Sequence, residues 1–450
     1  MAVKIVKVRG LQPVPSSPPP DSRRRMLGMA LLAALAWGAV VGVHGVRHRR
    51  FEALKLQMKA RGVPVSLAEF QEADIPNDQY AYPALRKALD GLDPAQFDRL
   101  KHPGLQVGPW NPGTRSAESS AVAPYLPRIA AEIAPALRKS RRLAKIDYIR
   151  WSRNPLTYDG PRLTRFIFTA EVLGLDANLR SYRGDAAGAW RDVRLILAMK
   201  ELVGQTHGLI AGLISVVLQN IATKSVIDMQ FARPSPRMPD DVAESFRRFL
   251  NERCVVHGMQ AEVAQRLDEL RFMEQASAGD AAFMDESAHD SWPGIVEYLL
   301  LRKAGLYDIS GMKLIRLEIS DSWPNDWASL KEQAAREAKS PTRSYASIVH
   351  YGPKVAGFLQ REWAARTWVR MALILRAARE YKAAHAAFPA TLERMSPQFI
   401  SSDLLIDAFT GQRYGYSVDR AGSKFELTSS GPKGDSKDFK NVPFLIRFPN

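Results

Sequence analysis

Residues 26–46 form an apolar segment, MLGMALLAALAWGAVVGVHGV, that contains no Asp, Glu, Lys or Arg. The hydrocarbon core of a bilayer is about 30 Å thick, and an α-helix needs about 20 consecutive apolar residues to cross it. The segment therefore predicts one membrane-spanning helix. Arginines flank it before and after, where a span would meet anionic lipid headgroups: Arg23, Arg24, Arg25, Arg47, Arg49 and Arg50.

The 25 residues before this segment are expected to be a disordered basic tail. They include PVPSSPPP at 13–20, which resembles a short polyproline linker and cannot build a core. Six Lys and Arg residues stand against one Asp in this tail, and residues 47–61 carry six against one Glu. Positive charge marks the cytoplasmic side of a membrane, so charge alone does not decide the orientation.

We expect an uncleaved signal anchor with a cytoplasmic N-terminus, because a short tail ending in three arginines before an apolar run has this layout. Two alternatives remain open. Ala34 and Ala36 form a small-x-small pattern that fits signal-peptide cleavage, although the apolar run continues past it. Residues 22–27, SRRRML, also resemble a twin-arginine export signal. The expected location is the bacterial inner membrane, with a single pass and a periplasmic body.

The net charge of the chain is +16 and its isoelectric point is near 9.9. Such a balance favours anionic partners. We expect these to be anionic lipid headgroups, together with an unidentified protein. We expect no nucleic acid, because the remaining basic residues are interleaved with acidic ones. Cys254 is the single cysteine, which excludes an internal disulfide, and its place in an amphipathic run indicates packing.

Outside the membrane, the pattern predicts a mainly α-helical protein with a small α+β tail. Hydrophobic residues make up 46% of the chain, which is ordinary for a globular core. Residues 47–124 are expected to be a membrane-proximal helical and loop region, with a break at Gly62 and Pro64 and a capping box of Ser66 and Glu69. Residues 125–387 are expected to be a helical body. Its clearest helices are predicted at 163–182, 186–203, 207–229, 242–273 and 354–387.

Two features of the helical body bear on its topology. Residues 209–222, LIAGLISVVLQNIA, carry no charged side chain. A central core helix is favoured over a second membrane span here, because Gln219 and Asn220 make the run short and polar. The helices on either side of Gly184 and Asp185 resemble a tetratricopeptide hairpin. A repeat array needs several copies at a fixed period and one is found, so we expect helical hairpins and not a solenoid.

Residues 388–450 change in character, and their glycine-rich turns and alternating aromatic residues predict a short antiparallel sheet. Four motifs follow one another: YKAAHxxFPxxL at 381–392, DAFTG at 407–411, YGY at 414–416 and FELTSSG at 425–431. This order resembles the C-terminal part of the major pseudopilins of type II secretion. The whole chain also resembles a group of uncharacterised membrane-anchored bacterial proteins. The N-terminus lacks a prepilin Gly–Phe cleavage signature, so only the fold of the tail is carried over.

The resemblance to pseudopilins also implies a calcium site, because a Ser-x-Gly-x-Asp-Gly loop in those proteins often binds calcium. In this chain Asp435 and Asp438 could supply ligands. Calcium takes six to eight oxygen ligands, largely from carboxylates, and Lys433 stands where an acid would help. A structural turn without a metal is the alternative prediction.

Catalytic motifs are weak, and no catalytic residue and no other cofactor is assigned. Ser310 and Lys313 match the Ser-x-x-Lys pattern of penicillin-binding enzymes without its supporting elements. An acidic stretch could surround a divalent metal, with a solvated loop as the alternative: Asp285, Glu286, His289 and Asp290.

Histidine and tryptophan residues give no clearer site. Four histidines lie far apart without ligand spacing: His207, His257, His350 and His385. Three tryptophans could form a binding groove or cap the helical core: Trp292, Trp323 and Trp327.

These observations favour a structural or interaction role. The expected function is a membrane-anchored envelope scaffold or accessory protein, linked to secretion or envelope maintenance, whose helical grooves hold a partner. The alternative is an envelope hydrolase whose site the sequence does not reveal. A lipid-facing module is a third possibility.

Overall fold

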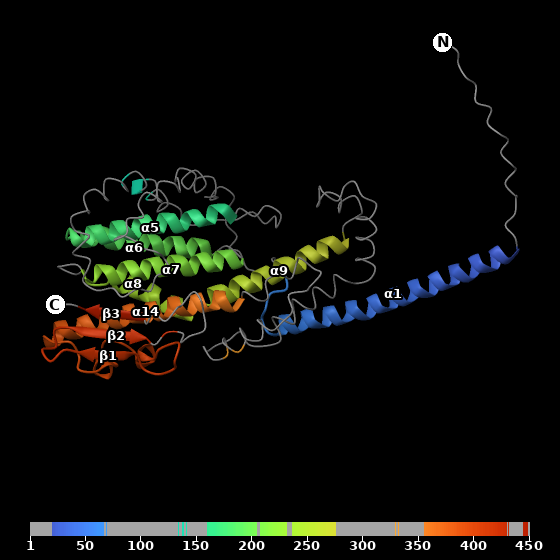
Figure 1. The fold of residues 1–450 in the computed structure, drawn as a ribbon. Helices are drawn as coiled ribbons and strands as arrows, with labels where there is room; N and C mark the ends of the chain where they lie inside the picture. The colour runs from blue at the N-terminus through green and yellow to red at the C-terminus, as the bar shows by residue number, and fades with distance from the viewer. Residues whose placement is uncertain are drawn as a thin grey trace, which may run out of the picture. The chain divides into compact units, whose positions relative to one another are not determined.

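The computed structural model describes residues 20–66, 69, 134, 137, 138, 141, 160–204, 208–231, 236–275, 329, 332, 355–429, 431 and 444–448. The described chain is mainly helical and ends in a small antiparallel sheet (Figure 1). It divides into two compact units. One contains Met1–Leu56 and Phe272–Lys313, and the other contains Gln57–Arg271 and Leu314–Asn450.

Helix α1, Pro20–Ala60, contains the whole apolar segment 26–46. It begins earlier than expected. Residues 20–25, which the sequence predicts to be part of a disordered tail, are helical. Proline is compatible with the first turn of a helix, since its missing N–H has no partner to lose there. The predicted end is confirmed: Gly62 adopts φ of +72°, and its N–H bonds the Lys59 carbonyl oxygen at 2.9 Å.

The turn after α1 uses Glu69 in a way that differs slightly from the predicted capping box. The Glu69 carboxylate accepts the backbone N–H of Val65 at 3.0 Å, one residue before Ser66. It also lies 2.8 Å from the Lys59 Nζ. The carboxylate therefore ties the turn back to the last turn of α1.

Three helices form the centre of the second unit: α5 (Gly160–Tyr182), α6 (Ala186–Gly204) and α7 (Leu209–Met229). Each of the three packs against the other two. The predicted break between the first two is confirmed, because Gly184 adopts φ of +79° and the Asp185 carboxylate accepts the Gly188 N–H at 2.8 Å. The likeness of this hairpin to tetratricopeptide repeats stays a prediction.

Helix α7 is the core helix that its sequence predicts. Within the described residues, it is long and apolar enough to cross a membrane, yet 83% of its apolar window is buried inside the fold. It packs against α5, α6 and the long helix α14, Val355–His385. Its apolar character on all sides follows from these neighbours, since a helix enclosed by others has no solvent face.

The single helix predicted at 242–273 is wrong. The structure has two helices here, α8 (Asp240–Asn251) and α9 (Cys254–Gln275). Between them Glu252 is extended, with ψ of 146°. Interactions with distant helices stabilise this break: the Glu252 carboxylate lies 2.5 Å from the Lys200 Nζ of α6. The Glu362 carboxylate of α14 accepts the Val255 N–H at 3.0 Å.

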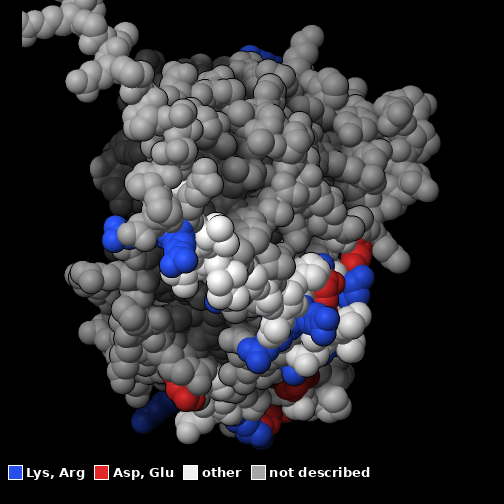
Figure 2. All heavy atoms as spheres, turned by 90° about the vertical axis from the view of Figure 1, so that its right-hand side faces the viewer, with Lys and Arg blue, Asp and Glu red and all other residues white. Residues whose placement is uncertain are grey.

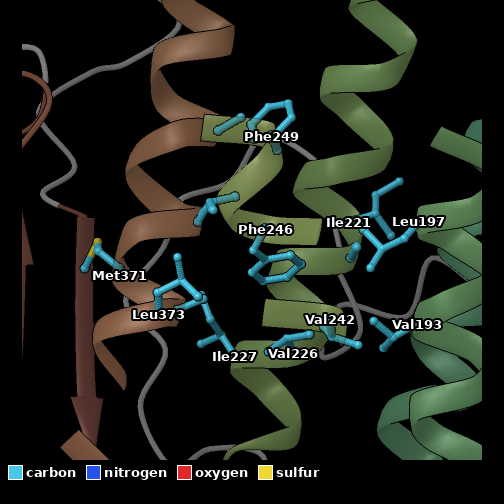
Figure 3. Packing of buried hydrophobic residues seen from close by; sticks show 14 of the residues in the cluster. Val193, Leu197, Ile221, Val226, Ile227, Val242, Phe246, Phe249, Met371 and Leu373 are labelled. Carbon is cyan, nitrogen blue, oxygen red and sulfur yellow. The ribbon is translucent and has the colours of Figure 1, made fainter. Parts of the chain in front are cut away.

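The main core joins α5, α6, α7, α8 and α14 to the C-terminal region. Figure 3 shows Phe246 of α8 pointing toward α7 and α14, near Ile227 and Leu373. Phe246 and Phe249 are both fully buried. Burying one such ring contributes roughly 1.5–3 kcal/mol, so these two side chains stabilise the packing of α8.

The C-terminal region confirms the predicted small sheet. After two 3₁₀ turns, η9 (Leu392–Met395) and η10 (Ser402–Leu405), come β1 (Gly415–Val418), β2 (Phe425–Ser429) and β3 (Phe444–Phe448). The strands are antiparallel in the order β1-β2-β3. In β2 alternate side chains are buried, and the Phe425 ring packs 4.7 Å from the Phe388 ring. The likeness of this tail to pseudopilins stays a prediction.

Candidate functional site

Most of the residues singled out in the sequence lie outside the described part of the chain. They are Asp285, Glu286, His289, Asp290, Trp292, Ser310, Lys313, Trp323, Trp327, His207, His350, Asp435 and Asp438. Among the described residues, no group of three or more His, Cys, Asp or Glu could hold a metal ion. The described histidines have separate surroundings: His385 stacks on Tyr381 at 4.2 Å, and burial lowers the pKa of His257.

The arginines that flank the apolar segment all belong to one helix, α1. Arg24, Arg25, Arg49 and Arg50 are exposed, and Arg47 is half-buried. The 21 residues between the two groups extend about 31 Å along a helix, at about 1.5 Å per residue. This length matches the hydrocarbon thickness of a bilayer.

Within the second unit, Lys and Arg residues are accompanied by acidic ones. Arg194 pairs with Asp241, and Arg376 with Asp240 and Glu380. Figure 2 shows basic and acidic residues close together over much of the described part of one face of the molecule. Although the net charge of the chain is strongly positive, Arg194 and Arg376 are each neutralised by nearby carboxylates.

A pocket of about 640 Å³ lies among the end of α6, the start of α7 and the α8–α9 junction. Four glycines line it, and at three of them, Gly208, Gly212 and Gly258, the backbones of α7 and α9 come very close. A Cβ at Gly212 would collide with the Cys254 carbonyl oxygen, and one at Gly258 would lie 2.7 Å from the Gly208 carbonyl oxygen. Side chains larger than hydrogen are excluded at these positions.

Lys200 is the charged group of the pocket wall, with only 2% of the residue exposed. Its Nζ lies 2.5 Å from Glu252 Oε2, 3.2 Å from Glu201 Oε1 and 5.4 Å from the Phe249 ring centroid. A buried ammonium requires such compensation, because removing a charge from water is costly. Two carboxylates and one aromatic ring supply it.

Ser215 also lines the pocket, and its Oγ has no hydrogen-bond partner although the residue is only 1% exposed. The other buried hydroxyls of α7 are satisfied within the helix. Thr223 donates to the Gln219 carbonyl oxygen at 2.8 Å, and Ser225 donates to the Ile221 carbonyl oxygen at 2.9 Å. Ser215 therefore stands out as a residue of the pocket lining whose buried hydroxyl has no partner.

Cys254 begins α9 at the edge of this pocket. Burial raises the pKa of its thiol, and the nearby Glu362 and Glu252 carboxylates raise this pKa further. The thiolate is the nucleophilic form of cysteine, so these surroundings make Cys254 unreactive. Its partial burial against the main core agrees with the predicted packing role.

A second polar cluster lies between α5 and α6. Asp176 and Asp192 are buried and share two arginines. Arg141 lies 2.6 Å from Asp176 and 3.5 Å from Asp192, and Arg180 lies 2.6 and 3.2 Å from the same two carboxylates. Burial and the adjacent Asp176 raise the pKa of Asp192 to about 7, although the two arginines oppose the shift. The ionisation of Asp192 therefore depends on its burial and on the charges next to it.

Sequence reasoning missed both clusters. Lys200 lies within the apolar spacing of the helix predicted at 186–203, and Ser215 lies within the uncharged run 209–222, so neither forms a motif of its own. A lysine on a buried stripe is itself a signal, because lysine is almost never fully buried without a partner. The spacing of Gly208 and Gly212, four residues apart at a helix start, is a second signal of a close helix contact.

Comparison with protein-family models, with curated proteins and with solved structures finds no match for this chain. The functional conclusions below therefore depend on its own residues and geometry.

Proposed function

We propose that this chain is a single-pass protein of the bacterial inner membrane, anchored by α1, whose periplasmic helical body acts as an envelope scaffold or accessory subunit. One observation carries the anchor. The large apolar side chains that the structure describes in the segment 26–46 are exposed, with Met26 at 64%, Leu27 at 74%, Leu32 at 68% and Leu35 at 62%. Lipid would cover side chains that water solvates poorly.

The contrast with α7 supports this proposal. Both helices contain long apolar runs, but the α7 run is 83% buried by protein, whereas the described large apolar residues of the α1 run are exposed. Burying a leucine or methionine side chain contributes roughly 1.5–3 kcal/mol. A helix that leaves several of them uncovered needs another apolar environment, and a bilayer provides it along the matching length.

The scaffold role is supported by the architecture of the body. Its described part is built of packed helices, and its candidate pocket contains no activated nucleophile among the described residues. Ser215 Oγ makes no hydrogen bond to a base, and the pKa of the Cys254 thiol is raised. The alternative of an envelope hydrolase therefore receives no specific support from this pocket.

The anchor is tested by extracting membranes at alkaline pH from cells that express the full chain. We expect the wild type to stay in the membrane pellet. The double variant Leu32→Arg/Leu35→Arg should shift to the soluble fraction, because each arginine near the middle of a span costs about 2.5–3.5 kcal/mol. Leu56→Arg is the matched control, since Leu56 is 66% exposed on the same helix but outside the apolar segment. Release of the wild-type protein would refute the anchor.

A further inference from the structure

We propose that the pocket among α6, α7 and α9 binds the carboxylate group of a small organic acid. The residues that carry this inference all lie in the second unit. The inference is independent of the membrane anchor, because it depends on unfilled hydrogen-bonding capacity inside the pocket.

The first unfilled donor belongs to Lys200. A lysine ammonium has three N–H donors. In the described residues, Glu252 and Glu201 provide two oxygen acceptors, at 2.5 and 3.2 Å, and the remaining neighbour is the Phe249 ring. One N–H is therefore left without an oxygen acceptor at a site that is almost inaccessible to bulk water.

The second unfilled donor is the Ser215 hydroxyl. Ser215 is 1% exposed and its Oγ has no partner, in contrast to Ser225 on the same helix. A buried hydroxyl without a partner lowers stability, so its retention beside a cavity indicates that a bound group completes it. An oxygen acceptor in the pocket would satisfy both Ser215 and Lys200.

The start of α7 adds a partial positive charge. The N-cap residue of this helix is Gly208, which provides no side-chain hydrogen bond to the first N–H groups. Such a helix end favours an anion, with a partial charge of roughly half an elementary unit. Gly208 and Ser215 both line the pocket, seven residues or about 10 Å apart along α7, so the helix end adds its partial charge at one side of the pocket and the hydroxyl lies at the other.

The charge balance favours a monoanion over a phosphate dianion. Lys200 and Arg253 line the pocket, but so do Glu201 and Glu252. The side-chain charges therefore cancel, and the helix end leaves a small positive excess. A single carboxylate fits this excess, whereas a dianion would be repelled by two nearby carboxylates.

The test uses the full chain in lipid nanodiscs and measures binding by isothermal titration calorimetry, with empty nanodiscs as blank. The probe is N-acetylglycine, and its neutral counterpart N-acetylglycinamide has the same size without the charge. We expect saturable binding of N-acetylglycine at least about tenfold tighter than that of the amide, as charge-assisted hydrogen bonds require. Inorganic phosphate should bind more weakly than N-acetylglycine. Absence of saturable binding, equal binding of the amide, or tighter binding of phosphate would overturn the proposal.

Two variants connect binding to this pocket. Ser215→Ala should weaken N-acetylglycine binding about three- to tenfold while leaving the melting temperature unchanged or higher, because it removes an unsatisfied hydroxyl. Ser225→Ala is the control: affinity should not change. Gly204→Val should block the pocket, since a Cβ there lies 3.9 Å from Ser215 Oγ without a clash. Wild-type affinity in either Ser215→Ala or Gly204→Val would refute the assignment, and the second variant serves if the first does not fold.

Discussion

At the scale of single residues, Asp192 shows how packing changes chemistry. It lies in a helix with 1% of its surface exposed, next to a second buried carboxylate, Asp176. Arg141 and Arg180 lower the pKa of Asp192, but burial and the adjacent Asp176 raise it by more. The folded protein consequently holds a proton on Asp192 at pH values where the unfolded chain has released it.

This proton makes stability depend on pH. The pKa of Asp192 rises from 3.8 to about 7 on folding, so its stabilising contribution is complete below pH 3.8 and is lost as the pH rises through 7. We expect the urea midpoint of the full chain to fall between pH 5 and pH 8. Asp192→Asn should flatten this dependence, because an amide does not titrate.

Asp185→Asn is the control for that measurement. The pKa of Asp185 is lowered by hydrogen bonds from the Gly188 N–H and from Arg180, so this group is ionised throughout pH 5–8. The variant should lower stability at both pH values and keep the slope of the wild type. An unchanged slope in Asp192→Asn would contradict the interpretation.

The glycines of the α7–α9 contact give a second prediction at this scale. Gly212→Ala should destabilise the protein by about 1–3 kcal/mol, because the new Cβ meets the Cys254 carbonyl oxygen and backbone atoms cannot move aside. Gly357→Ala in α14 is the matched control, since nothing lies within 4 Å of its Cβ position. That change should stabilise by about 0.5–1 kcal/mol. Urea denaturation measures both, and equal effects would refute the contact.

At the scale of elements, the periodic segments were predictable and the break between α8 and α9 was not. The helices α5, α6, α7 and α14 follow from apolar spacing and from turn residues such as Gly184. The break at Glu252 occurs within a sequence that keeps helical spacing. It is fixed by Lys200 and Glu362, which are distant in sequence and adjacent only after folding.

The candidate pocket was unpredictable for the same reason. Its Lys200, Ser215 and Cys254 come from three helices, and none forms a local motif with another. Local spacing reports on one element at a time, whereas a pocket requires the relative positions of several. The buried lysine and the glycine spacing at the start of α7 were the available signals.

Glu362 should therefore be critical to the break. Its carboxylate accepts the Val255 N–H at 3.0 Å and an Arg366 N–H at 2.9 Å, and Arg366 also donates to the Glu252 carbonyl oxygen. We expect Glu362→Ala to cost about 3–5 kcal/mol in unfolding free energy, because it leaves a largely buried arginine without a carboxylate partner and the Val255 N–H without its acceptor.

Two comparisons make this result specific. Glu362→Gln retains an acceptor for the Val255 N–H and should cost less than the alanine variant. Glu244→Ala removes an exposed partner of Arg247, with side-chain exposures of 62% and 46%, and should cost under about 1 kcal/mol. Similar losses in Glu362→Ala and Glu244→Ala, measured by urea denaturation, would refute the role of Glu362.

At the scale of the whole molecule, the equal basic flanks of the apolar segment make its proposed orientation sensitive to charge. Six Lys and Arg residues precede the segment and six lie in residues 47–61. The side with more positive charge near a span remains in the cytoplasm. A small change on one side should therefore alter the topology of the whole chain.

A periplasm-active reporter fused after Asn450 checks this prediction. The triple change of Arg23, Arg24 and Arg25 to Ser should lower reporter activity, because it shifts the positive excess to the body side. The mirror variant, with Arg47, Arg49 and Arg50 changed to Ser, should keep or raise activity. Identical activity in both variants would show that these charges do not decide the orientation.

The position of Cys254 has a practical consequence. It is the single thiol in 450 residues and begins α9 beside the α8–α9 break, where burial raises its pKa. A maleimide reagent can therefore modify the chain at one thiol, and the raised pKa of this thiol slows the reaction as long as the helix end stays folded. The rate of labelling at Cys254 therefore reports on local opening at the start of α9, and no cysteine has to be introduced to measure it.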